Sequence, residues 1–176
     1  MRVEIGAMVI AVVGVAGTLG GALLSQRGAE RAKRREIELL RAHEEVRENL
    51  TLRRACYAAL NRDSRQYTTA LNRHLHVMRE QGVQDADREA LDAAKAAHRD
   101  TYSEAQMIAP DAVLDSATTV NHALTLVYGQ VKRLERGAPE EGETMAAVSQ
   151  AQQEIWDLLR EMRAAMRVDL GVSAAD

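Results

Sequence analysis

The feature that most constrains this chain is an uncharged run of apolar residues near its N-terminus. Residues Ile5–Leu24 read IGAMVIAVVGVAGTLGGALL and contain no charged side chain. About 20 residues of α-helix extend about 30 Å, which is the thickness of the hydrocarbon core of a bilayer. A helix is the single-segment structure that satisfies its own backbone hydrogen bonds inside that core. The run therefore predicts a transmembrane helix over residues 5–25, after a short extracytoplasmic N-terminus of residues 1–4.

A basic segment follows the apolar run and predicts its orientation. Five positive residues form a basic juxtamembrane cluster, namely Arg27, Arg31, Lys33, Arg34 and Arg35. Such clusters stay in the cytoplasm, so we expect a single-pass protein of the cell membrane with a cytoplasmic C-terminal region. A cleaved signal peptide is the main alternative. The apolar run is longer than a typical signal-peptide core, however, and Glu4 offsets the charge of Arg2 before it.

Small residues inside the apolar run predict a contact between helices in the membrane. Gly17 and Gly21 form a GxxxG pair, and Ala16 and Gly20 repeat the spacing one position earlier. In lipid, such a face lets two helix backbones approach closely. We therefore expect self-association through a membrane dimer face at Gly17 and Gly21. The alternative is that glycine is simply common in bacterial transmembrane helices and marks no contact here.

After residue 25 the apolar residues recur with a helical period. Only 2 prolines and 11 glycines occur among 176 residues, so long helices can run uninterrupted. We expect a basic juxtamembrane segment and long amphipathic helix over 26–81, three shorter helices over 82–170 and a frayed tail over 171–176. The predicted fold class is all-α: one N-terminal transmembrane helix followed by a long helix and an antiparallel helical bundle or coiled-coil region.

One stripe of the long helix combines a heptad repeat with polar interruptions. Its apolar residues follow a spacing of three and four from Leu39 to Met78, and the polar positions between them include Arg53, Ser64 and His74. Two explanations stay open. The stripe pairs with the same stripe of a second copy in a parallel coiled coil, or it folds against the later helices of its own chain.

Turn signals divide the remainder of the chain into three helices. Residues 81–83 contain a glycine and predict the first break, and Asp85 is the expected N-cap of a helix that runs to about Ile108. Pro110 starts the next helix, and the loop at 136–142 separates it from the last. The repeat is cleanest in the helix after Pro110, whose apolar positions are Val113, Ala117, Val120, Leu124, Val127, Val131 and Leu134.

No pattern in the sequence indicates catalysis or a cofactor site. The phosphate-binding loop GxxxxGK[ST] and the nucleophile elbow GxSxG do not occur. No two of the 5 histidines have the i, i+3 or i+4 spacing that a helical metal site needs, and the single cysteine, Cys56, is expected to be a buried structural thiol. We therefore predict a protein that is not an enzyme and holds no cofactor or metal.

The distribution of charge argues against direct nucleic-acid binding. The formal net charge is -3, and the basic residues between Arg27 and Arg41 are interleaved with Glu30, Glu36 and Glu38. Control of topology and attraction to anionic lipid headgroups account for this segment. We expect the membrane as a partner together with self-association, and direct contact with DNA is the weaker alternative.

The stretch Gly14–Glu36, GVAGTLGGALLSQRGAERAKRRE, resembles the KilB or spread-type membrane proteins of actinomycete conjugative plasmids. The chain length and the richness in arginine and alanine are similar as well. The resemblance implies a membrane-anchored helical structural or interaction protein that supports plasmid transfer or spread during conjugation, with plasmid transfer proteins as partners. It carries over no catalytic residue. The alternative function is a membrane-tethered sensor or regulatory protein that acts through a helical cytoplasmic bundle.

Overall fold

Four α-helices make up the part of the chain that the structure describes. The computed structural model describes residues 2–80 and 82–172, with side chains from residue 33 onward. The helices are α1 (Arg2–Glu80), α2 (Asp85–Ile108), α3 (Asp111–Glu135) and α4 (Met145–Asp169), and the described residues contain no β-strand. The all-α prediction is confirmed at this level. The chain divides into two units, residues 1–49 and residues 50–176, and α1 contributes to both.

The turn between α1 and α2 lies where the sequence predicts a break. Gly82 has a φ of 80°, a left-handed conformation that glycine adopts at little cost. The predicted cap of α2 is wrong by one residue, because Gln84 and not Asp85 is the N-cap. The Gln84 backbone N–H donates to Asp87 Oδ2 at 3.2 Å, which satisfies a donor that the helix itself leaves unpaired.

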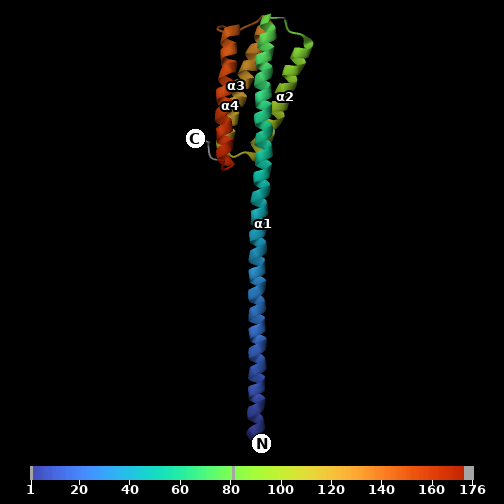
Figure 1. Ribbon diagram of the computed structural model, residues 1–176, viewed down its shortest axis with the longest axis vertical. Coiled ribbons are helices and arrows are strands. Elements are labelled where there is room, and N and C mark those ends of the chain that lie inside the picture. Colours follow the sequence, from blue (N-terminus) through green and yellow to red (C-terminus); the bar gives the residue numbers. More distant parts are fainter. Residues whose placement is uncertain (1, 81, 173–176) are drawn as a thin grey trace. The chain divides into compact units, whose positions relative to one another are not determined.

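Residues 50–172 form an antiparallel four-helix bundle. Over these residues α1 and α3 run in one direction, and α2 and α4 run in the other (Figure 1). Contacts between helices agree with these directions. His74, late in α1, contacts Glu135 at the end of α3, whereas Tyr57, earlier in α1, contacts Asp169 at the end of α4. Short loops join successive helices, which is why neighbours are antiparallel.

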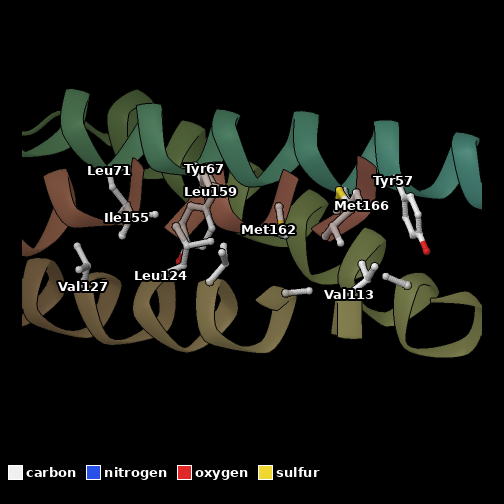
Figure 2. Close-up of a cluster of buried hydrophobic side chains, with 14 of the residues drawn as sticks. Tyr57, Tyr67, Leu71, Val113, Leu124, Val127, Ile155, Leu159, Met162 and Met166 are labelled. Carbon is white, nitrogen blue, oxygen red and sulfur yellow. The ribbon is translucent and has the colours of Figure 1, made fainter. Parts of the chain in front are cut away.

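The core of the bundle is built from heptad stripes. α3 and α4 each bury six residues at alternating spacings of four and three, the pattern that turns one face of a helix inward. Figure 2 shows Tyr57, Met166 and Val113 toward one end of the cluster and Leu71, Ile155 and Val127 toward the other. Six predicted positions of α3 are buried, namely Val113, Ala117, Val120, Leu124, Val127 and Val131.

Helix α2 packs more sparsely than its neighbours. Its buried residues are Leu91, His98 and Ala105, which recur once in every seven positions. Ala94 and Tyr102 fill part of the space between them as half-buried residues. A helix that fully buries one residue per two turns removes less apolar surface from water than one that buries two. The attachment of α2 to the core is therefore the weakest by this measure.

The predicted membrane segment lies outside the described side chains. Where side chains are described, no helix is long and apolar enough to cross a membrane. The predicted transmembrane helix, residues 5–25, falls in the stretch of α1 for which the structure describes the backbone alone. The expected extracytoplasmic N-terminus, residues 1–4, falls there too. Both therefore stay predictions.

Two leucines of α3 test the packing of the bundle. Leu124 is 0% exposed and Leu126 is 54% exposed. We expect Leu124→Ala to lower the free energy of unfolding by about 2–5 kcal/mol, because it removes buried methyl groups and leaves a cavity. Leu126→Ala is the control and is expected to change it by less than about 1 kcal/mol. Denaturant unfolding of the full-length protein followed by circular dichroism measures both, and equal losses would contradict the packing.

Candidate functional site

The residues that the sequence singles out as functional all belong to the first unit, residues 1–49. Four of them lie in the stretch of α1 for which the structure describes the backbone alone: Gly17, Gly21, Arg27 and Arg31. The other three are described and exposed: Lys33, Arg34 and Arg35. Every residue from 33 to 49 is exposed, so the described part of this unit presents a surface and not an enclosed site.

Exposed apolar side chains continue the heptad stripe before the bundle begins. Leu39 is 62% exposed and Val46 is 60% exposed, and Leu50 is partly exposed. We call Leu39, Val46 and Leu50 the proximal stripe. Single exposed apolar residues are ordinary, but a row of them at heptad spacing is typical of a helix that pairs with another helix.

The chain's own helices cover the rest of the predicted stripe. Tyr57, Leu60, Tyr67 and Leu71 are at most 3% exposed, and they belong to one core cluster with residues of α2, α3 and α4. A second copy cannot pair with this part of the stripe while the bundle is folded. A coiled coil along the whole of Leu39–Met78 is therefore wrong, and packing against the chain's own helices is the explanation that holds from Tyr57 onward.

The polar positions of the stripe inside the bundle each have a partner on a different helix. The three pairs are Arg53 with Asp169 of α4 (3.0 Å from Nη1 to Oδ1), Ser64 with His98 of α2 (3.1 Å from Oγ to Nδ1) and His74 with Glu135 of α3 (3.1 Å from Nε2 to Oε2). A shifted helix would leave these groups buried without partners, at a cost of about 1–3 kcal/mol each. The polar positions therefore favour one register of the four helices.

A row of polar side chains in contact with one another crosses the middle of the bundle. His98 lies between Ser64 and Asn121, with 3.2 Å between its Nε2 and Asn121 Oδ1. Ser64 Oγ also donates to the Leu60 carbonyl at 2.6 Å. Burial lowers the pKa of His98, so its imidazole is neutral at neutral pH.

The contact between Ser64 and His98 pairs a hydroxyl group with an imidazole, a combination that nucleophilic catalysis uses. Ser64 is 0% exposed and His98 is 2% exposed. No substrate can reach a hydroxyl enclosed to this degree in the folded bundle. The contacts of Ser64, His98 and Asn121 therefore join α1, α2 and α3, and they do not form an accessible reactive site.

Three basic side chains contact Glu135 at the end of α3. Arg88 of α2 donates to its carboxylate from Nε at 2.5 Å, Lys132 Nζ lies 3.2 Å from Oε2, and His74 of α1 contacts the same oxygen. Burial alone raises the pKa of this carboxyl group. Hydrogen bonds from the three bases outweigh burial and lower the pKa to about 2. Glu135 is therefore ionised at neutral pH and ties three helices together.

A second carboxylate joins α1 and α4 at the opposite end of the bundle. Asp169 accepts hydrogen bonds from Arg53 and from Tyr57 Oη, the latter at 2.7 Å. Burial, together with the hydrogen bond to Asp169, raises the pKa of Tyr57, so the phenol keeps its proton and remains a donor. The two carboxylates thus hold the bundle from both ends.

The one cysteine has no environment that would activate it. Cys56 is buried, at 2% exposure, which confirms the predicted structural thiol. Burial raises the pKa of the thiol, and a raised pKa keeps it in the unreactive protonated form. Within the described side chains, no group of three or more His, Cys, Asp and Glu residues could hold a metal ion.

Three buried polar residues were missed from the sequence, namely Asp63, Thr68 and Gln152. Gln152 of α4 is 0% exposed, and its Nε2 donates to the Thr68 carbonyl of α1 at 3.1 Å. The signal that could have identified it is its spacing, because Gln152 occupies the heptad position between Val148 and Ile155. A polar residue at such a position is buried when its amide finds a backbone partner.

Comparisons with known proteins assign no family to the chain. No protein-family model, no curated protein and no solved structure matches it. The resemblance of residues 14–36 to KilB or spread-type proteins therefore stays a prediction, and functional inference depends on the chain's own residues.

The pKa of Glu135 predicts how stability depends on pH. Because the folded pKa of about 2 lies below the ordinary value of 4.5, the carboxylate stabilises the fold above about pH 4.5, and this contribution is lost as the pH falls toward 2. We expect the free energy of unfolding to drop by roughly 2–3 kcal/mol over this range through Glu135. Glu135→Gln should flatten the dependence, as measured by denaturant unfolding at each pH.

The matched control for this measurement is Glu141→Gln. Glu141 is exposed in the loop between α3 and α4, so the substitution makes the same change of charge without touching the cluster. It is expected to leave the pH dependence close to that of the unmodified protein. An unchanged pH dependence in Glu135→Gln would show that this carboxylate does not stabilise the fold.

Proposed function

We propose that the protein is a membrane-anchored helical interaction protein with a cytoplasmic bundle. The observation that carries the proposal is the uncharged run Ile5–Leu24 followed directly by the basic cluster Arg27–Arg35. This order is typical of a single transmembrane helix whose C-terminal flank stays in the cytoplasm. The backbone of α1 is helical over the whole run, as a segment that spans a bilayer requires.

For the biological process, we propose support of plasmid transfer or spread during conjugation, with plasmid transfer proteins as partners. The resemblance of Gly14–Glu36 to the KilB or spread-type proteins supports this part. The described bundle is compatible with an interaction role, because Ser64, His74 and Gln152 make their buried polar contacts between its own helices and so stabilise the fold. In this proposal the protein needs no cofactor and does not act on DNA directly.

A membrane-tethered sensor or regulatory protein is the second candidate function. It is favoured by one feature of the bundle, an arginine-lined groove between α1 and α2 that has the size of a small-molecule site. The partners separate the two candidates. Plasmid transfer proteins that co-purify with the protein from native membranes support the first, whereas a kinase or a transcription factor supports the second.

Self-association is proposed through surfaces that the bundle core does not use. These are the membrane face at Gly17 and Gly21 and the proximal stripe, where Leu39 and Val46 are exposed. A short stripe is too weak to hold two free chains together in solution. Anchoring both chains in one membrane raises their effective concentration, so a short coiled coil can then contribute.

A topology experiment tests the anchor. A reporter fused after Asp176 should be active if it functions in the cytoplasm, and alkaline phosphatase at the same position should be inactive. The protein should also remain in the membrane after carbonate washing. Val12→Arg with Val13→Arg should release it, because each arginine at the centre of a span costs about 2.5–3.5 kcal/mol. An active phosphatase fusion, or release of the unmodified protein, would overturn the proposal.

Crosslinking in membranes tests self-association. Gly17→Ile with Gly21→Ile should reduce the crosslinked dimer by blocking close backbone approach. Leu39→Asn with Val46→Asn should reduce it further by removing apolar contacts of the proximal stripe. Leu126→Asn, at an exposed position of α3, is the control and should leave the dimer unchanged. Undiminished crosslinking in both double variants would rule out these surfaces.

A further inference from the structure

A groove between α1 and α2 has the features of a ligand site that the polar core does not explain. It is open to solvent and has a volume of about 460 Å³, within the range of roughly 300–1,000 Å³ that is common for small-molecule sites. Arg62, Arg65 and Arg73 of α1 line it, together with Gln66 and Thr69. The lining residues carry three positive charges and include no carboxylate.

The groove exists because α2 packs sparsely against α1. Two alanines also line it, the half-buried Ala70 of α1 and the exposed Ala90 of α2, and their side chains are too short to fill the space between the helices. The nearest buried residue of α2, Leu91, points into the core at 1% exposure. A lining of alanines and arginines suits a ligand that has both an uncharged body and anionic groups.

Neighbouring side chains orient the guanidinium groups without using all of their donors. Arg62 donates to the buried Asp63 from Nε at 2.8 Å and from Nη2 at 3.3 Å. Arg73 Nη2 lies 3.8 Å from Asp87 Oδ1, which is an ion pair beyond hydrogen-bond length. Each arginine has five N–H donors, and the fork that they form matches phosphate. Arg62 and Arg73 are 61% and 74% exposed, so an incoming anion can reach them.

A smaller recess adjoins the groove and ends at a buried histidine. The recess holds about 20 Å³ and shares Ala70, Arg73 and Ala90 with the groove, enough space for a single oxygen atom or water. His74 also lines it, is 1% exposed, and its Nδ1 has no hydrogen-bond partner. A buried polar atom without a partner is uncommon and indicates a missing contact.

The chemistry of the recess favours a hydroxyl group. His74 Nε2 lies 3.1 Å from Oε2 of Glu135 and carries the proton that it donates to this carboxylate, so Nδ1 is the ring nitrogen without a partner. The carboxylate of Asp87 lines the same recess. A hydroxyl group can both donate and accept hydrogen bonds, so it suits an unpartnered ring nitrogen beside a carboxylate better than an anionic oxygen does. Arg62 and Arg65, which line the groove but not the recess, favour the anion.

We propose that the α1–α2 groove binds a small organophosphate that carries free hydroxyl groups, with its phosphate on Arg62 and a hydroxyl in the recess beside Arg73 and His74. Arg62 and Arg73 are eleven residues apart in the sequence, about 16 Å along a helix, so a ligand that reaches both is elongated and of nucleotide size. All residues of the proposed site belong to the bundle, so binding does not depend on the membrane anchor. The ligand would bridge α1 and α2 where their direct packing is weakest.

Calorimetric titration of the full-length protein with 5′-AMP, ribose 5-phosphate and inorganic phosphate tests the proposal. We expect saturable binding of at least one of the two organophosphates, tighter than that of inorganic phosphate. Arg62→Gln with Arg73→Gln should weaken it by about tenfold or more per arginine, as expected for loss of a charge-assisted hydrogen bond. Ala90→Leu should also weaken it, because the larger side chain would occupy part of the groove.

Two controls keep the experiment decisive. Arg99→Gln with Arg160→Gln removes the same charge from exposed positions outside the groove, and Ala164→Leu adds the same bulk at an exposed position of α4. Both should bind as the unmodified protein does. Absence of organophosphate binding at millimolar concentration, or unchanged binding in the Arg62/Arg73 variant, would overturn the proposal. Inorganic phosphate that binds as tightly as both organophosphates would overturn the hydroxyl contact at His74.

Discussion

The bundle depends on three polar contacts that α1 makes with the other helices. Arg53, Ser64 and His74 occupy positions of its heptad stripe where apolar residues would otherwise pack, and each pairs with a different helix. Apolar contacts are non-directional and tolerate shifts of register, whereas buried hydrogen bonds do not. The apolar residues therefore supply most of the driving force, and the polar pairs define which helix lies where along α1.

Much of the architecture follows from periodicity and turn chemistry. The stripes of α3 and α4 are regular, so their buried faces can be assigned from the sequence, and the breaks at Gly82 and Pro110 lie at strong local signals. The cap of α2 is displaced by one residue because Gln84 and Asp85 are both capable of starting a helix, and the position of Asp87 decides between them. Local rules succeed where local interactions dominate.

The partners of the polar positions could not be predicted in the same way. Arg53 and Asp169 are 116 residues apart in the sequence, and their contact depends on the lengths of all the intervening helices and loops. The α1–α2 groove could not be predicted from the sequence for a related reason. Alanines such as Ala90, which carry no chemical signal, line it, and a gap between helices becomes visible only when their relative positions are known. Gly17 and Gly21 lie where the structure describes the backbone alone, so the proposed membrane dimer face follows from the sequence only.

The sparse packing of α2 has a consequence for how the bundle opens. Because α2 buries residues only at Leu91, His98 and Ala105, detaching it exposes less apolar surface than detaching α3 or α4. Local unfolding proceeds through the segments with the fewest buried contacts. Release of α2 would uncover Ser64 and the adjoining face of α1 while α3 and α4 stay paired with each other. Local unfolding of α2 would thus expose a second helix-binding surface on α1. A ligand that bridges α1 and α2 would lower the population of this open state.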